Sequence, residues 1–221
     1  MLNTRCVLTA LLSGYALAAQ ASALTAPYTE TFDSAAANWS SGSTFTALTY
    51  QPSGGPDGSA YGTRSVSFAT NPVGDIPLLF RGQSNFGSSG GNFWGDWIAG
   101  GVTSFSFSVR HNAPVPVTFF ARFTPGAVGA VALVSPPLAP NTWATFTVPI
   151  DPSTPFVYEG TTFGTVFNNI NRVQVGVMVD SAIAGQAGPY TFDIDNVSIV
   201  PAPGVAGLAG LAGLVALRRR R

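Results

Sequence analysis

The sequence is poor in groups that carry chemistry. Its 221 residues include one cysteine and one histidine, all ten basic residues are arginines, and charged residues make up only 9% of the chain. Without lysine it cannot build a phosphate-binding loop of the kind that needs one. With one histidine it cannot build a metal centre from several imidazoles. These shortages argue against most metal-dependent and nucleotide-dependent enzymes.

Positive charge is scarce in the middle of the chain. From Leu24 to Val200 there are five arginines against ten acidic residues, a net charge of −5. No two of these arginines are adjacent. Proteins that bind nucleic acid concentrate basic residues to neutralise phosphates. The composition therefore argues against nucleic acid as a partner.

The N-terminus, residues 1–23, has the pattern of a secretory signal peptide. Arg5 precedes an apolar stretch from Cys6 to Ala19, and the small residues Ala-Ser-Ala end the segment at Ala23. The alternative is an ordinary N-terminal core helix. Because Cys6 lies inside this segment, the processed chain would contain no thiol and no disulfide. A catalytic cysteine, a zinc–thiolate site and an iron–sulfur cluster are then excluded.

The C-terminus combines a short apolar run with a basic end. The 13 residues from Val205 to Leu217 would form a helix about 20 Å long, which is short for a bilayer core of about 30 Å. Four arginines follow directly, a stop-transfer and positive-inside signal: Arg218, Arg219, Arg220 and Arg221. We expect a membrane helix over about 204–217, with the arginines in the cytoplasm. The alternative is a low-complexity tail.

This tail, residues 201–221, resembles the PEP-CTERM sorting signal of Gram-negative bacteria. Pro201 and Pro203 frame an alanine where the family usually has glutamate. The resemblance implies transient anchoring in the inner membrane, processing by an exosortase-type enzyme, and delivery to the cell surface or an extracellular matrix.

Residues 24–200 show the alternation of antiparallel β-strands. In 102–110 three apolar residues alternate with three serines, and 117–123, 145–150 and 172–180 alternate in the same way. Turn-forming segments rich in glycine and proline separate these runs. We predict an all-β domain, an antiparallel two-sheet sandwich of the jelly-roll type, with at most a short helical turn within 161–170.

This body also resembles carbohydrate-binding jelly rolls of the galactose-binding-like class. The similar segments are Glu-Thr-Phe-Asp at 30–33, 141–150, and the closing strand 192–200. In such domains a structural calcium often ties the first strand to the last. The resemblance implies Glu30, Asp195 and Asp193 as ligands, with Asp33 as a neighbour. The alternative is that they are plain surface carboxylates.

The segment Phe-Trp-Gly-Asp-Trp, 93–97, is the most distinctive candidate for ligand binding. Trp94 and Trp97 could stack on sugar rings, with Asp96 bonding to hydroxyl groups and Tyr61 contributing from another loop. The alternative is that the tryptophans close the core, because large aromatic residues are more often buried. We expected the glycine-rich stretch 81–97 to form a surface loop.

The sequence therefore favours an exported, non-catalytic domain that binds polysaccharide of the matrix. One alternative is a structural or adhesive matrix protein without a glycan ligand. Another is a glycan-active hydrolase that uses Asp193 and Asp195, which lie two apart on one strand and so face the same side.

Overall fold

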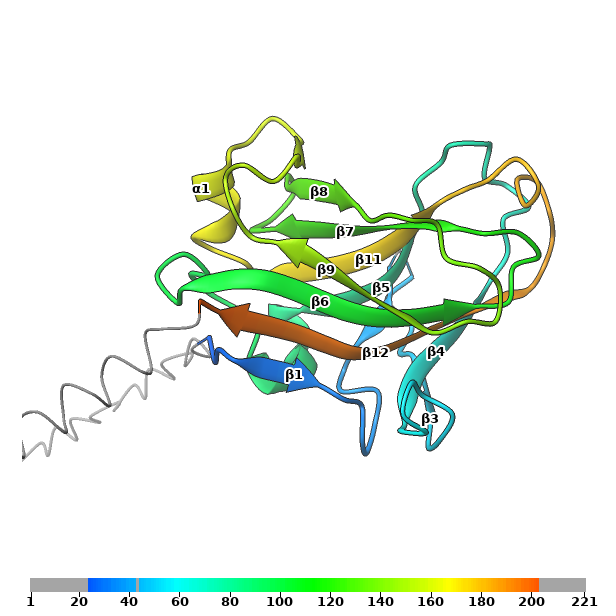
Figure 1. Cartoon of the computed structure of the whole chain (residues 1–221), viewed down its shortest axis with the longest axis horizontal. Coiled ribbons are helices and arrows are strands. Elements are labelled where there is room, and N and C mark those ends of the chain that lie inside the picture. The colour runs from blue at the N-terminus through cyan, green and yellow to red at the C-terminus, as the bar shows by residue number, and fades with distance from the viewer. Residues whose placement is uncertain (1–23, 43, 203–221) are drawn as a thin grey trace, which may run out of the picture.

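The computed structural model describes residues 24–42 and 44–202, and they form a β-sandwich (Figure 1). Two antiparallel sheets of six strands each stack face to face, which confirms the predicted all-β, two-sheet fold. The predicted signal peptide, the membrane helix, Pro203 and the four terminal arginines lie outside the described residues. Within the described part, no helix is long and apolar enough to span a bilayer.

The last strand organises the first sheet. This strand, β12, pairs with β4 on one side and with β6 on the other. The order of the sheet is β3-β4-β12-β6-β9, with β1 also paired to β12. The strands are β1 (Tyr28–Glu30), β3 (Thr49–Gln51), β4 (Tyr61–Val66), β6 (Val102–His111), β9 (Ala144–Pro149) and β12 (Tyr190–Pro201).

The second sheet has the order β10-β8-β7-β11-β5-β2. Its strands are β2 (Ser40–Ser41), β5 (Leu78–Gln83), β7 (Thr118–Thr124), β8 (Ala130–Leu133), β10 (Val157–Tyr158) and β11 (Arg172–Met178). Most connections between successive strands cross from one sheet to the other, as a jelly roll requires.

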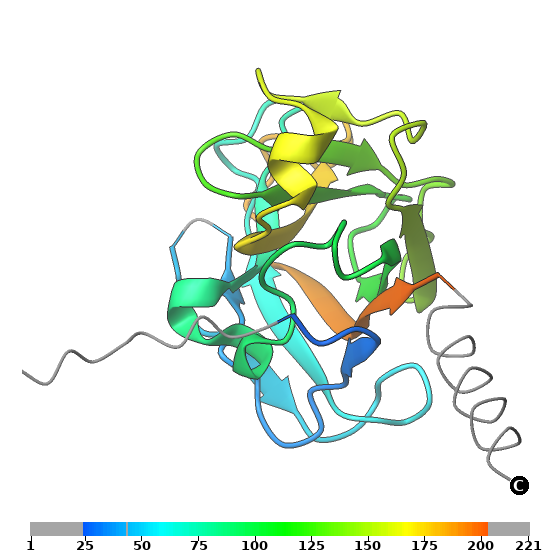
Figure 2. The ribbon, with the colours of Figure 1, turned by 90° about the vertical axis from the view of Figure 1, so that its left-hand side faces the viewer.

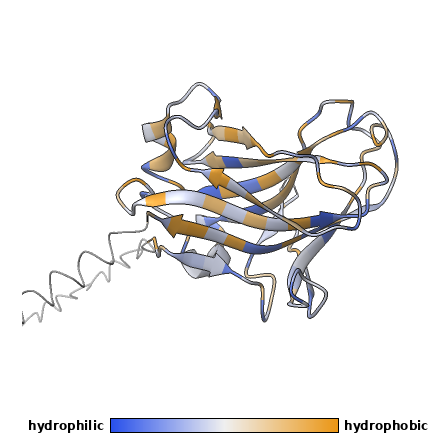
Figure 3. Ribbon diagram, viewed as in Figure 1, coloured by the Kyte–Doolittle hydropathy of each residue, from blue (hydrophilic) through white to orange (hydrophobic). Residues whose placement is uncertain are grey.

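The core lies between the sheets and is rich in phenylalanine. Apolar residues alternate with polar ones along the strands, as the colouring in Figure 3 shows. In β6, Phe105, Phe107 and Val109 point inward and are fully buried, as the alternation predicted. The apolar residues predicted to share one face of β7 and of β11 are buried as well. Period-two patterning therefore fixes which face of each strand enters the core.

Three short helices lie at one end of the sandwich, which Figure 2 views directly. They are η1 (Ser84–Phe86), η2 (Ser88–Gly91) and α1 (Phe163–Phe167). The helix α1 confirms the predicted helical turn, and the Thr162 side chain caps it by accepting a hydrogen bond from the Thr165 N–H.

Candidate functional site

The structure overturns the expectation that Trp94 and Trp97 are displayed for stacking. Their exposed fractions are 3% and 0%, and both belong to the core. The indole N–H of Trp97 donates to the Phe93 carbonyl at 2.7 Å. Asp96 is exposed, but one of its oxygens accepts the Ala99 N–H in a local turn. The stretch 81–97 therefore packs against the sandwich and is not a free surface loop. Burial of its two tryptophan rings stabilises this packing.

Tyr61, the remaining predicted ligand residue, belongs to a separate cluster on the outer face of the first sheet. Its ring and that of Trp143 meet edge to face, and the Arg110 guanidinium lies over both rings at 5.1 and 4.8 Å. Arg110 donates to Asp193, to the Gly54 carbonyl and to the Tyr61 hydroxyl. A pocket of about 280 Å³ lies beside this cluster. Each nitrogen of Arg110 has one protein partner, and these bonds tie β6 to β12, to β4 and to the loop that carries Gly54.

Two of the three predicted calcium ligands are bound to protein groups. Asp193 accepts from Arg110 at 2.8 Å and from the Thr63 hydroxyl at 2.5 Å. Glu30 accepts from the Phe32 N–H at 2.9 Å. The expected pairing of β1 with β12 is present. Among the described residues, however, no three acidic, histidine or cysteine side chains are grouped closely enough to hold a metal ion.

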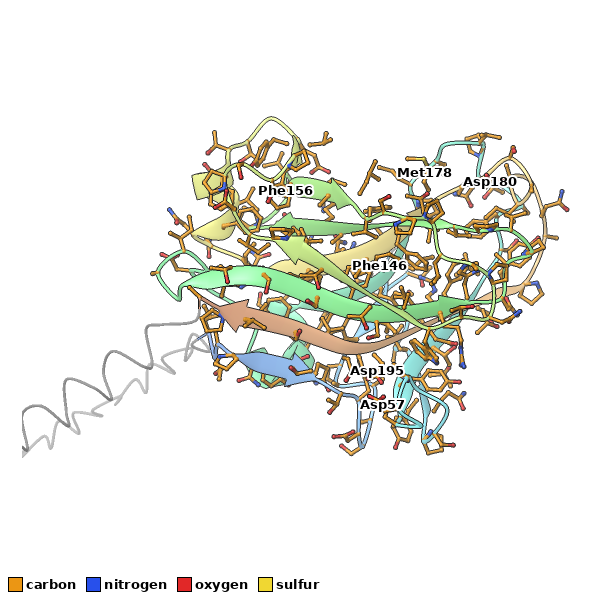
Figure 4. All side chains as sticks on the ribbon, in the orientation of Figure 1. Asp57, Phe146, Phe156, Met178, Asp180 and Asp195 are labelled. Atoms are coloured by element: carbon orange, nitrogen blue, oxygen red, sulfur yellow. The ribbon has the colours of Figure 1, made fainter. Side chains whose placement is uncertain are left out.

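Asp195 is different, because it is fully buried and no basic group within residues 24–42 and 44–202 contacts it. Its carboxylate accepts hydrogen bonds from the Ser59 hydroxyl and the Asn196 N–H. Burial, together with the negative charges of Asp33 and Asp57, raises its pKa to about 6. Figure 4 shows Asp195 and Asp57 beside each other, below the first sheet.

Among the described residues, His111, Ser89 and the pair Asp193 and Asp195 are not arranged as a hydrolase would need them. His111 is buried and stacked on Phe192, with Nε2 2.9 Å from the Leu138 carbonyl oxygen. Ser89 is also buried and accepts the indole N–H of Trp39. The pair Asp193 and Asp195 is divided, because Arg110 binds one carboxylate directly while the other lies away from any basic group.

A third group of residues, missed at the sequence level, lies on the outer face of the second sheet. Strand register places Gln174 of β11 directly between Arg81 of β5 and Arg122 of β7. It also places Arg172 opposite Gln83. Directly opposite residues point to the same side of a sheet. Since the valines of β11 point into the core, these five side chains share the outer side, and we call them the arginine face.

The arginine face holds buried polar atoms without partners. Gln174 is 0% exposed and Arg81 is 8% exposed. The Nε atoms of Arg81 and Arg172, the Oε1 of Gln83 and the Nε2 of Gln174 find no hydrogen-bond partner within the described part of the chain. An unpaired buried polar group costs about 1–3 kcal/mol, so proteins rarely leave several together. These four atoms are themselves buried, so a ligand would meet the face first at Arg122 and Arg172, which are only half-buried.

The positive charges on this face repel one another. Burial and the positive charges of Arg172 and Arg122 lower the pKa of Arg81 to about 10. In the described part of the chain, Arg122 alone of these arginines has an acidic partner, Glu159, whose carboxylate it binds through two nitrogens. Functional sites often combine burial with like charge in this way.

Exposed aromatic rings border the arginine face. Phe45 and Phe86 are 52% and 39% exposed, and their rings meet edge to face with centroids 5.7 Å apart. The guanidinium of Arg81 lies 4.6 Å from the Phe45 ring centre. Phe86 belongs to η1, which directly follows β5, so the fold places both rings at the edge of the polar group.

A pocket of about 590 Å³ lies at the opposite end of β7 and β11. It is lined by Thr118, Met178 and Asp180, among others, and the last two are labelled in Figure 4. Gly176, between this pocket and the arginine face, has no room for a side chain because the Phe120 ring lies over it.

Comparison with known proteins gives a likeness only at the level of structure. No protein-family model and no curated protein sequence matches the chain. Similar solved structures include carbohydrate-binding modules of Clostridium thermocellum. The family 22 module and catalytic module of its endo-1,4-beta-D-xylanase 10B, complexed with xylohexaose, match with 14% identity and a TM-score of 0.48 over 80% of this chain and 28% of that one.

The C-terminal family 22 module of the same xylanase matches with 15% identity and a TM-score of 0.44, over 80% of this chain and 95% of that one. An exo-beta-agarase matches with 14% identity and a TM-score of 0.49, over 79% and 25%. The chain thus spans about a quarter of the xylanase and agarase structures. At these values the likeness assigns the chain to no family; the structure itself establishes an antiparallel β-sandwich.

Proposed function

We propose that the protein is a non-catalytic module that binds polysaccharide on the outer face of the second sheet. The observation that carries the proposal is the group of arginine and glutamine side chains on the arginine face, several of whose polar atoms lack partners within the described residues. Arg122 and Arg172 are only half-buried, and the hydroxyls of a sugar can accept hydrogen bonds from their solvent-facing guanidinium nitrogens.

The adjacent aromatic pair supplies the apolar half of such a site. The C–H face of a sugar ring packs on an aromatic face, and Phe45 and Phe86 offer their rings to solvent. The arginine face covers residues 172–174 of β11 and the two neighbouring strands, about 7 Å along the strands and about 10 Å across them. Together with the aromatic pair, this area is large enough to contact one or two sugar units.

Replacing Phe45 and Phe86 together by alanine is expected to weaken glycan binding about tenfold, because the stacking surface is lost. Isothermal titration of the purified protein with soluble polysaccharides measures this. Val200→Ala, which removes an exposed apolar side chain from β12 of the other sheet, is the control and should bind as the parent does. Unchanged affinity in the double variant contradicts the stacking role.

The structural or adhesive alternative predicts a different result. If no glycan binds to the intact protein, whichever polysaccharide is tried, the polysaccharide proposal fails and a matrix role through protein contacts takes its place. The same experiment therefore separates the two hypotheses.

We also propose calcium, centred on Asp195 rather than on the full set that the resemblance implied. Asp193 is bound by Arg110, but Asp195 has no basic partner within the described residues and lies in the field of Asp33 and Asp57. A hard cation would take Asp195 as its carboxylate ligand, would need backbone carbonyl or water oxygens as the others, and would offset the repulsion between the three acidic groups. Millimolar calcium should then raise the melting temperature by several degrees, and chelator should reverse the rise; an unchanged melting temperature contradicts calcium binding.

Export and sorting are proposals that rest on the two ends of the sequence. The pattern of 1–23 and the tail 201–221 support secretion, transient inner-membrane anchoring and exosortase-type processing. Cells that express the full chain should hold a membrane-bound precursor, which disappears when 201–221 are deleted. A precursor that stays in the membrane after the deletion contradicts the proposed anchor.

A further inference from the structure

We propose that the arginine face selects acidic polysaccharides, those with carboxylate or sulfate groups along the chain. This inference rests on the proposed polysaccharide-binding function and names the class of its ligand.

The first argument is the distribution of charge. Three of the five arginines in 24–200 lie on this one face, although the region as a whole has a net charge of −5. Among the residues that the structure describes, Glu159 is the only acidic side chain bonded to any of the three. The arginine face is therefore a locally positive surface on an acidic domain, which concentrates anionic ligands from solution.

The second argument is the state of the individual guanidinium groups. Arg122 donates four hydrogen bonds, two to Glu159, one to the Gln174 side-chain oxygen and one to the Ala127 carbonyl. Within the described part of the chain, Arg172 donates one bond, to the Gly126 carbonyl at 3.3 Å, and the Arg81 guanidinium donates none. The Nε atoms of both are buried and unpartnered. Two planar forks with free donors match the paired oxygens of a carboxylate or sulfate.

The third argument comes from what surrounds these charges. A buried cation is normally paired with an anion, since leaving it unpaired is costly. Arg81 instead has aromatic and amide neighbours and two more cations in its field. Removing its charge should thus leave stability unchanged or increase it, whereas a purely structural arginine would leave the protein weaker when replaced. Binding sites typically contain residues that lower the stability of the folded protein.

The test compares three probes on the purified protein: oligomers of polygalacturonate, the same oligomers methyl-esterified, and a sulfated dextran oligosaccharide. The ester has the same backbone without the charge, and the sulfated probe distinguishes sulfate from carboxylate. We expect the acidic form to bind at least tenfold more tightly than the ester, with an affinity that falls as salt is raised.

Arg81→Gln and Arg172→Gln should each lower the affinity for the acidic probe about tenfold and bring it near that of the ester. Arg110→Gln, which removes the same charge from the other sheet, should not. All titrations are made well below each variant's melting temperature, and that temperature should not fall in Arg81→Gln.

The outcomes separate the two claims. Equal binding of acid and ester, unaffected by Arg81→Gln and Arg172→Gln, overturns the selectivity for acidic chains and leaves polysaccharide binding in place. A loss of affinity in Arg110→Gln as large as in Arg81→Gln also overturns it, because general charge would then explain the effect. Absence of binding by all three probes and by neutral glycans overturns the proposed function itself.

Discussion

Replacing Trp97 by alanine is expected to lower the free energy of unfolding by about 3–5 kcal/mol, as large-to-small changes of buried aromatics do. Trp97 is fully buried, stacked on Phe105 and edge-on to Phe123 with centroids 6.1 and 5.6 Å away. Its indole N–H holds the Phe93 carbonyl, which would lose its partner. The substitution thus creates a cavity and an unpaired polar group together.

Urea unfolding of the purified protein measures this effect. Trp143→Ala is the control, because Trp143 is only partly buried and packs on the surface against Tyr61; its replacement should cost much less. Glycan binding by folded Trp97→Ala should match that of the parent. A stable Trp97→Ala variant that has lost glycan binding would contradict the burial and restore the loop tryptophans as ligand residues.

The second large effect concerns Asp195 and pH. Its folded-state pKa of about 6 lies above the ordinary value of 3.8, because burial disfavours the charged form. Between these two values the folded protein binds the proton more tightly than the unfolded chain. Stability is therefore highest below about pH 4 as far as this group is concerned, and it falls as pH rises towards 6, by about 2–3 kcal/mol in all.

Asp195→Asn removes this titration while its amide can still meet Ser59 and the Asn196 N–H. In metal-free buffer the variant should be about 2 kcal/mol more stable than the parent at pH 7 and nearly equal to it at pH 4. Asp193→Asn is the control with the opposite sign, because it breaks the ion pair with Arg110. If Asp195→Asn is destabilised at pH 7 in chelator, the carboxylate has a favourable partner that the present geometry does not include.

The fold could be predicted from sequence because alternation is a local signal. The residues of β6 that point inward are two apart in sequence, so their shared face is visible without any tertiary information. The 81–97 stretch could not be predicted this way. Its glycines and serines are typical of a surface loop, yet Phe93, Trp94 and Trp97 anchor it to the core, a contact that depends on the whole sandwich.

The candidate site was missed because its parts come from three strands. Arg81, Arg122 and Arg172 are about 40 to 50 residues apart in sequence, and only the sheet order β7-β11-β5 brings them together. The sequence did contain one signal for the site. In each of β5, β7 and β11, a long polar residue alternates with buried apolar residues and so lies on the other face of the strand. Sequence alone could not supply the register that aligns them. It likewise could not separate Asp193 from Asp195, whose partners, Arg110 and Ser59, lie on different elements.

The most direct measurement is a backbone amide NMR titration of the protein with polygalacturonate oligomers. Binding on the arginine face predicts that the amides of 81–86 and 172–174, together with Phe45, shift with increasing ligand, while those around Tyr61 and Trp143 stay unchanged. Shifts confined to the Tyr61, Arg110 and Trp143 cluster would place the glycan on the other sheet and contradict the site proposed for this protein.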